Sequence, residues 1–282
     1  MLISIVNGFK EYKRFVRISI ANSIVGLVFT VTFVLMLGLR GALISTVTYQ
    51  SVMFFITVLM IRDMPLSARQ AIRQKFDRLI ASRYFKYSLM ALTTAAMLPV
   101  SQMLLRTYVI THISSVEAGW WEGMNRISNM YLMVITSSFG VYYLPRLSEL
   151  NGRNELRNEI IKAYKVLVPI MLVGFVFIYL LRHVVIRVLY TPDFFPMADL
   201  FVWQLTGDFF KICSWLLAFL MVAKSMTKTF IVTEIIFAFL YVGLGLIFVQ
   251  HSHSVVGLNQ AYLLNFIIYT LCMVVIFRKI LI

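Results

Sequence analysis

Eight long runs of mostly apolar residues are the feature that most constrains this chain. A helix needs about 20 apolar residues to cross a hydrocarbon core of ~30 Å, and each run is close to that length. Because 60% of the 282 residues are apolar and only 13% are charged, little sequence is left for a soluble domain. The runs cover residues 18–38, 41–62, 84–109, 120–143, 164–183, 199–222, 229–249 and 257–277.

The form of these runs decides the fold class. Ten-residue segments of alternating apolar and polar residues, which are typical of an outer-membrane barrel, are absent from the sequence. A helix satisfies all its backbone hydrogen bonds within one segment, as the hydrocarbon requires. We therefore predict an all-α polytopic membrane protein with about eight transmembrane helices.

Basic residues concentrate in alternate loops, which predicts the orientation. Counted loop by loop, 20 of the 26 Lys and Arg residues fall on one side of the predicted membrane. Because positive loops stay inside, both termini are predicted to be cytoplasmic. The basic loop at 63–83 could in principle bind nucleic acid or anionic headgroups, but the alternation favours a topology signal on the inner leaflet. We expect the lipid bilayer as a partner and no nucleic acid.

The start of the chain predicts a missing segment. MLISIV, residues 1–6, is too short to span a bilayer and has no cleavage site after it, so it resembles the end of a helix. Residues 5–62 also align weakly with 220–279, with Gly41 near Gly257, which suggests an internal repeat. The expected organisation is a remnant of an N-terminal lobe at 1–62, a basic linker at 63–83 and a complete six-helix lobe at 84–282.

Charged and polar residues lie inside several predicted spans. A charge at the centre of a span costs about 2.5–3.5 kcal/mol on insertion scales, so it normally faces a partner or water. Three neighbouring helices each carry a polar stripe at helical spacing, and we expect these stripes to face one hydrated cavity. The stripes are Thr94, Gln102 and Arg106, then Glu122, Arg126 and Asn129, then Gln204, Asp208, Lys211 and Trp215.

A purely structural interpretation stays open for each charged pair. Asp208 and Lys211 could neutralise each other and tie helices together, and Glu122 with Arg126 lies near a helix end, where side chains can reach the interface. Three stripes together favour a pathway. Glu234, a few residues into its helix, is expected to be interfacial.

Signatures of other chemistries are weak. The sequence contains no Gly-rich phosphate loop and no nucleophile elbow, and its four histidines show no metal-ligand spacing. Cys213 and Cys272 are both mid-helix and are expected to pack as small apolar residues. We expect a transporter rather than an enzyme, with no cofactor and no metal.

Two stretches carry a family resemblance. GWWEGMNRISNMYLMVITSSFGVYYLPRLSEL at 119–150 and LFVWQLTGDFFKICSWLLAFLMVAKS at 200–225 resemble the Wzx family of polysaccharide repeat-unit flippases. Within that family, the O-antigen translocases and the lipid III flippases of enterobacterial common antigen synthesis are the most similar. NGFKEYKRF near the start and LMALTTAAMLPVSQMLLR at 89–106 fit the same family, so the resemblance covers nearly the whole chain.

The resemblance implies a substrate and roles for the polar stripes. The family belongs to the multidrug/oligosaccharidyl-lipid/polysaccharide exporter superfamily and moves undecaprenyl-pyrophosphate-linked oligosaccharides across the bacterial inner membrane by alternating access. It implies cationic contacts from Arg106, Arg126 and Lys211, tuning or coupling by Asp208 and Glu122, and sugar contacts from Gln204, Asn129 and Gln102. A polysaccharide polymerase and a chain-length regulator are possible partners of such a protein.

The chain departs from the family pattern in its number of spans. Members usually have twelve to fourteen, so eight implies that about four N-terminal helices are absent and that activity is in question. Two alternatives remain open: a non-transporting membrane fragment or assembly partner, and a drug or cation antiporter in which Asp208 is the proton or sodium site.

Overall fold

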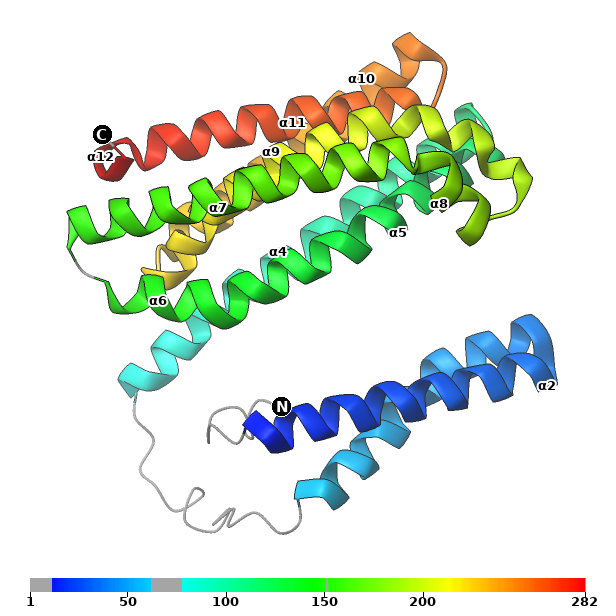
Figure 1. Cartoon of the computed structure of the whole chain (residues 1–282), viewed down its shortest axis with the longest axis horizontal. Coiled ribbons are helices and arrows are strands. Elements are labelled where there is room, and N and C mark those ends of the chain that lie inside the picture. Colours follow the sequence, from blue (N-terminus) through cyan, green and yellow to red (C-terminus); the bar gives the residue numbers. More distant parts are fainter. Residues whose placement is uncertain (1–11, 62–77, 151, 282) are drawn as a thin grey trace. The chain divides into compact units, whose positions relative to one another are not determined.

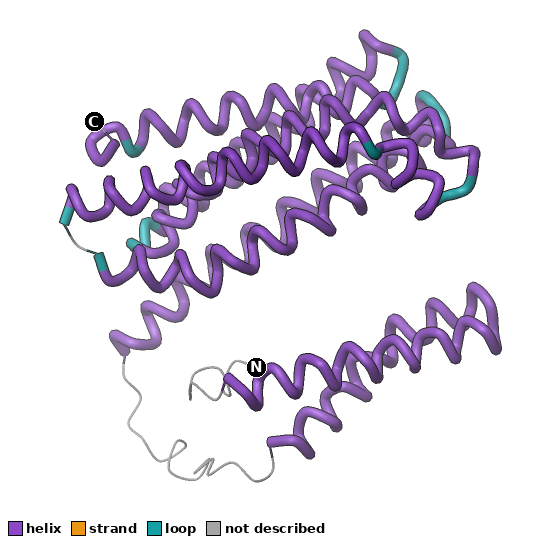
Figure 2. The backbone as a smooth tube through the Cα atoms, viewed as in Figure 1, coloured by secondary structure: helices purple, strands orange, loops and turns teal. Residues whose placement is uncertain are grey.

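The computed structural model describes residues 12–61, 78–150 and 152–281. Within these ranges all regular elements are helices (Figure 2), which confirms an all-α polytopic membrane protein. The N-terminal MLISIV and most of the basic 63–83 loop lie outside the described residues. The chain divides into two compact units, Met1–Phe76 and Asp77–Ile282, and each is considered by itself.

The described part of the first unit is a helical hairpin. Element α2 (Tyr12–Ile61) doubles back at Gly38, which has φ 58° and ψ −134° (Figure 1). This positive φ favours glycine, because residues with a side chain rarely adopt it. The arms approach closely, since the Tyr49 hydroxyl lies 3.5 Å from the Asn22 carbonyl oxygen and a Cβ on Gly26 would stand 2.4 Å from the Tyr49 ring. The two predicted runs in this region are thus the two arms of one hairpin.

The second unit is a bundle arranged around one central helix, α9. Figure 1 shows α9 running between the other long helices, and α9 contacts α5, α7, α10 and α11. The elements in chain order are α4 (Arg78–His112), α5 (Ser115–Ser138), the π-helical turn η1 (Phe139–Tyr143), α6 (Leu144–Glu149), α7 (Arg153–Leu180), α8 (Arg182–Leu189), the 3₁₀ segment η2 (Pro192–Leu200), α9 (Phe201–Ala223), α10 (Thr227–Ser252), α11 (Val256–Ile276) and α12 (Arg278–Leu281).

Burial differs sharply between the helices of this bundle. The most apolar window of Pro192–Ala223 is 61% buried, whereas that of Arg153–Leu180 is 6% buried. Helix α7 therefore presents its apolar side chains outward, where lipid would cover them. Helix α9 presents its side chains to neighbouring helices, so any polar group on it must find partners inside the protein.

Two local features shape the α5 region. Pro145 lacks a backbone N–H, and the helix widens into the π-helical turn η1, which ends two residues before it at Tyr143. At the other end, Ser114 caps α5 by accepting from the Glu117 N–H at 3.0 Å. The Glu117 carboxylate accepts from the Val255 N–H at 2.7 Å and from the Ser254 hydroxyl at 3.1 Å, which ties the α4–α5 turn to the α10–α11 turn.

The predicted number of eight spans is not confirmed. Within the described ranges, six helical stretches are long and apolar enough to cross a membrane. The α2 hairpin contributes one of these, Val16–Tyr49, although it has two arms. Helix α5, predicted as a span at 120–143, is not among them. Its sequence includes Glu117, Glu122 and Arg126. Helix α4 begins at Arg78, before the predicted start of its span at 84, and its candidate membrane-spanning stretch runs from Tyr84 to His112.

The two hairpins aligned in the predicted repeat, within residues 5–62 and 220–279, each need a glycine at the start of the returning arm. A Cβ on Gly41 would lie 1.8 Å from the Phe33 carbonyl oxygen, and a Cβ on Gly257 would lie 2.6 Å from the Phe248 carbonyl oxygen. In both, glycine allows the returning arm to start against the backbone of the outgoing arm. The repeat itself, and the lobes inferred from it, stay predictions.

Candidate functional site

Asp208 is fully buried in α9 and is surrounded by hydroxyl donors. Its carboxylate accepts hydrogen bonds from Ser128 at 2.6 Å, from Tyr262 at 2.6 Å and from Tyr131. Its exposed fraction is 0%. Gly207 makes the approach of α11 possible, because a Cβ there would stand 2.5 Å from the Tyr262 ring. A glycine next to the aspartate therefore lets a tyrosine from another helix reach it.

Gln204 extends this network by one helical turn. Its side-chain Nε2 lies 3.4 Å from both oxygens of Asp208, and its Oε1 accepts from Asn259 Nδ2 at 2.8 Å. Three helices, α5, α9 and α11, are thus linked by one polar network. In a low dielectric such hydrogen bonds are strong and hold the three helices in one arrangement, although Asn259 Oδ1 is buried without a partner.

Lys211 reaches Asp208 through a tyrosine. Its ammonium donates to the Tyr262 hydroxyl at 3.0 Å, and that hydroxyl donates to Asp208 at 2.6 Å. The ammonium also lies 5.0 Å from the ring centroid of Trp215 and 5.3 Å from those of Tyr262 and Phe266. Such cation–π contacts are worth more where water is excluded. The expected neutralisation of Lys211 by Asp208 is therefore bridged rather than direct.

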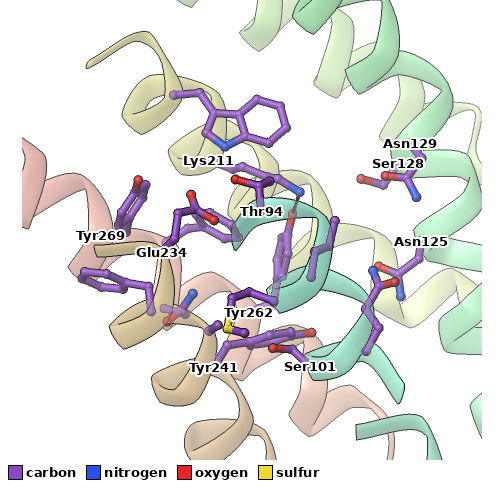
Figure 3. A pocket seen from close by; sticks show the side chains of 18 residues that line it. Thr94, Ser101, Asn125, Ser128, Asn129, Lys211, Glu234, Tyr241, Tyr262 and Tyr269 are labelled. Carbon is purple, nitrogen blue, oxygen red and sulfur yellow. Dashed lines mark hydrogen bonds between the residues drawn. The ribbon is translucent and has the colours of Figure 1, made fainter. Parts of the chain in front are cut away.

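A first cavity of about 200 Å³ opens beside Lys211. Residues of α4, α5, α9, α10 and α11 line it, and Figure 3 shows Asn125 and Asn129 on one side of the view and Glu234 on the other. Its amide and charged lining consists of Gln102, Asn125, Asn129, Lys211, Glu234 and Asn265. Two of these amides keep a buried atom without a hydrogen-bond partner, namely Asn125 Nδ2 and Asn265 Oδ1.

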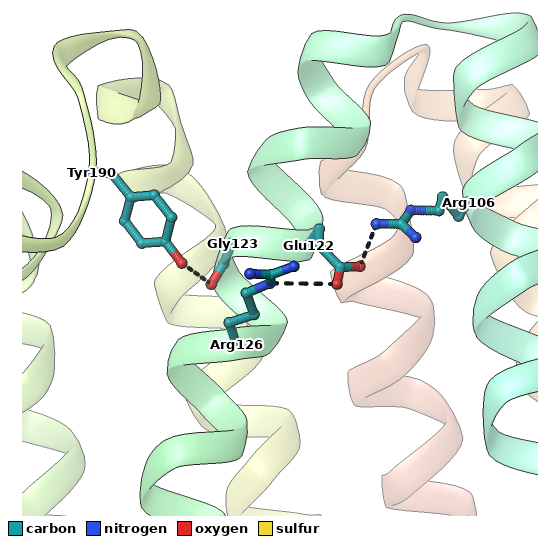
Figure 4. A network of polar contacts seen from close by, with 5 residues as sticks. All are labelled: Arg106, Glu122, Gly123, Arg126 and Tyr190. Atoms are coloured by element: carbon teal, nitrogen blue, oxygen red, sulfur yellow. Dashed lines mark hydrogen bonds and ion pairs between the residues drawn. The ribbon is translucent and has the colours of Figure 1, made fainter. Parts of the chain in front are cut away.

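A second cavity of about 550 Å³ lies by the first turns of α5. Glu122 contacts two arginines there, with Arg106 at 3.1 Å and Arg126 at 3.6 Å (Figure 4). The side chains are solvent-accessible, with exposed fractions of 48% for Arg106, 34% for Glu122 and 69% for Arg126. Two guanidinium groups against one carboxylate leave a net positive charge, which suits an anionic group.

The eight predicted site residues thus form three groups instead of lining one cavity. Gln102, Asn129 and Lys211 line the first cavity. Arg106, Glu122 and Arg126 line the second. Gln204 and Asp208 line neither, and their exposed fractions are 1% and 0%.

The expectation that Asp208 lies on the cavity wall beside both arginines was therefore wrong. A stripe at intervals of four residues runs along the helix as well as around it. The α4 stripe consequently begins in the first cavity at Thr94 and Gln102 and ends in the second at Arg106.

Several lining residues were missed from the sequence. Glu234 was expected at the interface, but it lines the first cavity together with Lys211. Tyr262, Asn265 and Tyr269 lie at intervals of three and four residues on α11 and line the same cavity. This spacing is the signal that could have identified them, but their helix contains no charged residue to draw attention to it.

Comparison with known proteins agrees with the resemblance. The chain is 29% identical over 274 residues to the lipid III flippases of Escherichia coli (strain K12) and Shigella flexneri. The match covers 96% of this chain and 65% of each relative, so the chain spans less than two thirds of their length. No solved structure matches the chain.

The family assignment rests on a match that is much longer than the short stretches that suggested the resemblance. Residues 4–199 match the family described as polysaccharide biosynthesis protein, which is well over half of the 282 residues. This match and the flippase relatives confirm the resemblance to the Wzx-type flippases that the sequence indicated. The chain belongs to the polysaccharide biosynthesis protein family.

Proposed function

We propose that this protein takes part in moving undecaprenyl-pyrophosphate-linked oligosaccharides from the cytoplasmic to the periplasmic leaflet of the bacterial inner membrane, with both termini in the cytoplasm. The family and the relatives named as flippases support the class of function. An O-antigen unit and the lipid III unit of the enterobacterial common antigen are both candidate substrates.

The observation that carries the proposal is the pair of cavities lined by polar and charged side chains in a largely apolar bundle. Intramembrane charges are expensive, so they are generally found where a substrate, an ion or water must pass. Here Lys211 and Glu234 line one cavity, and Arg106, Glu122 and Arg126 line the other. A substrate with sugars, a pyrophosphate and a polyprenyl tail needs polar groups inside the protein and an apolar exterior.

The two arginines are the proposed contacts for the pyrophosphate. Arginine offers paired N–H donors that match phosphate oxygens, and both guanidinium groups are accessible in the larger cavity. Glu122 keeps the two guanidinium groups together while the site is empty. Asp208 and Gln204 act indirectly, because they hold Tyr262 and Lys211 in position.

The test is restoration of surface polysaccharide in a cell that lacks its own flippase. We expect the wild-type chain to restore it and the Arg106→Ala/Arg126→Ala double variant to abolish it while still inserting. Arg187→Ala is the matched control, since Arg187 is exposed on α8 and lines neither cavity. A chain that inserts well but restores nothing would favour a non-transporting membrane component, and full activity in the double variant would remove the arginines from the site.

A further inference from the structure

We propose that the first cavity is a subsite for one sugar ring of the lipid-linked oligosaccharide, separate from the site of its pyrophosphate. This proposal rests on the proposed function and adds the substrate part that each cavity takes. It places Lys211 among the sugar contacts rather than beside the two arginines.

The charges of the first cavity fit a sugar better than a pyrophosphate. Among the described residues that line it, Lys211 is the one cation and Glu234 the one carboxylate. Their charges cancel, and Glu234 would repel an incoming phosphate. A carboxylate accepts hydrogen bonds from two hydroxyls and an ammonium donates to hydroxyl oxygens, so the same pair suits a polyhydroxylated ring.

The unpartnered amide atoms point to a ligand that both donates and accepts. Asn265 is 4% exposed and its Oδ1 has no hydrogen-bond partner, and Asn125 Nδ2 is likewise buried without one. A buried polar atom left unsatisfied is costly and uncommon in proteins. A sugar hydroxyl can donate to the first atom and accept from the second, which would satisfy both.

The aromatic lining and the size of the cavity agree with a single ring. Trp215, Phe237, Tyr241 and Phe266 line it along with the amides. The C–H face of a sugar packs on aromatic rings while its hydroxyls bond outward to polar groups. A volume of about 200 Å³ lies below the range of about 300–1,000 Å³ that drug-sized ligands occupy. It admits one ring and not a whole oligosaccharide.

The test is to measure the binding of small probe molecules to the purified protein in nanodiscs, by tryptophan fluorescence and by the shift of the melting temperature. The probes are methyl glycosides of neutral and N-acetylated hexoses, inorganic pyrophosphate, and a short-chain isoprenyl-pyrophosphoryl sugar. Asn265→Leu removes the unpartnered acceptor and keeps the number and branching of the side-chain heavy atoms. The cavity beside it leaves room for the larger methyl groups, so the melting temperature should be unchanged or higher. Gln250→Leu is the control, because Gln250 is an exposed amide on α10 outside both cavities.

We expect Asn265→Leu and Glu234→Gln each to weaken binding of at least one glycoside about tenfold, equivalent to ~1.4 kcal/mol, with pyrophosphate binding unchanged. Arg126→Ala should weaken binding of pyrophosphate and leave binding of the glycosides unchanged. The isoprenyl-linked sugar should bind more weakly to the variants of either cavity. If Asn265→Leu binds the isoprenyl-linked sugar as tightly as the wild type does, the cavity binds only free sugar. That result would overturn the proposal.

Two further results would also overturn it: no glycoside binding by the wild type, or loss of pyrophosphate binding in Asn265→Leu and not in Arg126→Ala. Both can be distinguished from failure of the proposed function, which shows as no surface polysaccharide with the wild-type chain. Restored polysaccharide without glycoside binding rejects only the sugar subsite.

Discussion

Asp208 and Glu122 are two carboxylates in one bundle that are held in opposite ways. Asp208 is fully buried and accepts from the hydroxyls of Ser128, Tyr131 and Tyr262. Glu122 keeps 34% of its side chain exposed and contacts two arginines that are more exposed still. Charge alone therefore does not determine what a carboxylate contributes.

The difference lies in what surrounds each group. A buried carboxylate without partners would be strongly disfavoured, so the donors around Asp208 are a condition for the fold. An accessible ion pair gains little free energy over hydrated charges and is screened by salt. Asp208 is thus expected to matter for stability, and Glu122 for the ligand that its arginines can bind.

The largest effect on stability is expected for Asp208→Ala. Removing the shared acceptor leaves several buried donors without a partner, so we expect a loss of about 3 kcal/mol in stability. Thermal unfolding of the purified protein measures it. Asp199→Ala is the control, since Asp199 is exposed in η2, and equal melting temperatures for the two variants would contradict the structural role of Asp208.

Gly207→Ala tests the contact that brings α11 to Asp208. The new Cβ would stand 2.5 Å from the Tyr262 ring, and overpacking of this kind costs about 1–3 kcal/mol. Gly243→Ala is the matched control, because nothing lies within 4 Å of a Cβ there, and helix propensity should make it slightly stabilising. If both alanines behave alike in thermal unfolding, the close approach at Gly207 is not needed.

Tyr262→Phe isolates the bridge between Lys211 and Asp208. It keeps the ring under the ammonium but removes the hydroxyl that both groups share. Interhelical hydrogen bonds in membranes average about 0.6 kcal/mol and reach about 1.7 kcal/mol, so a loss in that range is expected. Tyr142→Phe, at a 67% exposed position, should melt like the wild type; a larger loss there than at Tyr262 would contradict the bridge.

Glu122→Gln should have the smallest effect on stability. Exposed ion pairs contribute about 0–1 kcal/mol, so the melting temperature should change little, and high salt should remove any difference. Binding of pyrophosphate should instead become tighter, because a neutral glutamine at position 122 no longer competes with the phosphate groups for the two arginines. A destabilisation as large as that of Asp208→Ala would show that the two carboxylates are equivalent after all.

The sequence predicted the polar residues better than their grouping. All eight predicted residues lie in a cavity or in the network beside one. Periodicity shows which residues share a face of one helix, but not which helix that face meets. Ser128 and Asp208 are 80 positions apart in the chain, and Tyr262 and Asp208 are 54 apart. Neither partner of Asp208 carries a charge that would have identified it.

The sequence alone determined that this is an α-helical membrane protein. Its apolar runs are long enough to cross the membrane, and in hydrocarbon each backbone group must find its hydrogen-bond partner within its own helix. The hairpin turns were also marked locally, because glycine is required where one arm starts against another. Only the tertiary structure decided that Lys211 lines one cavity with Glu234 and four amide side chains, while Arg106 and Arg126 share Glu122 elsewhere. Helix packing sets these distances, and it depends on the fit of whole helix surfaces to one another.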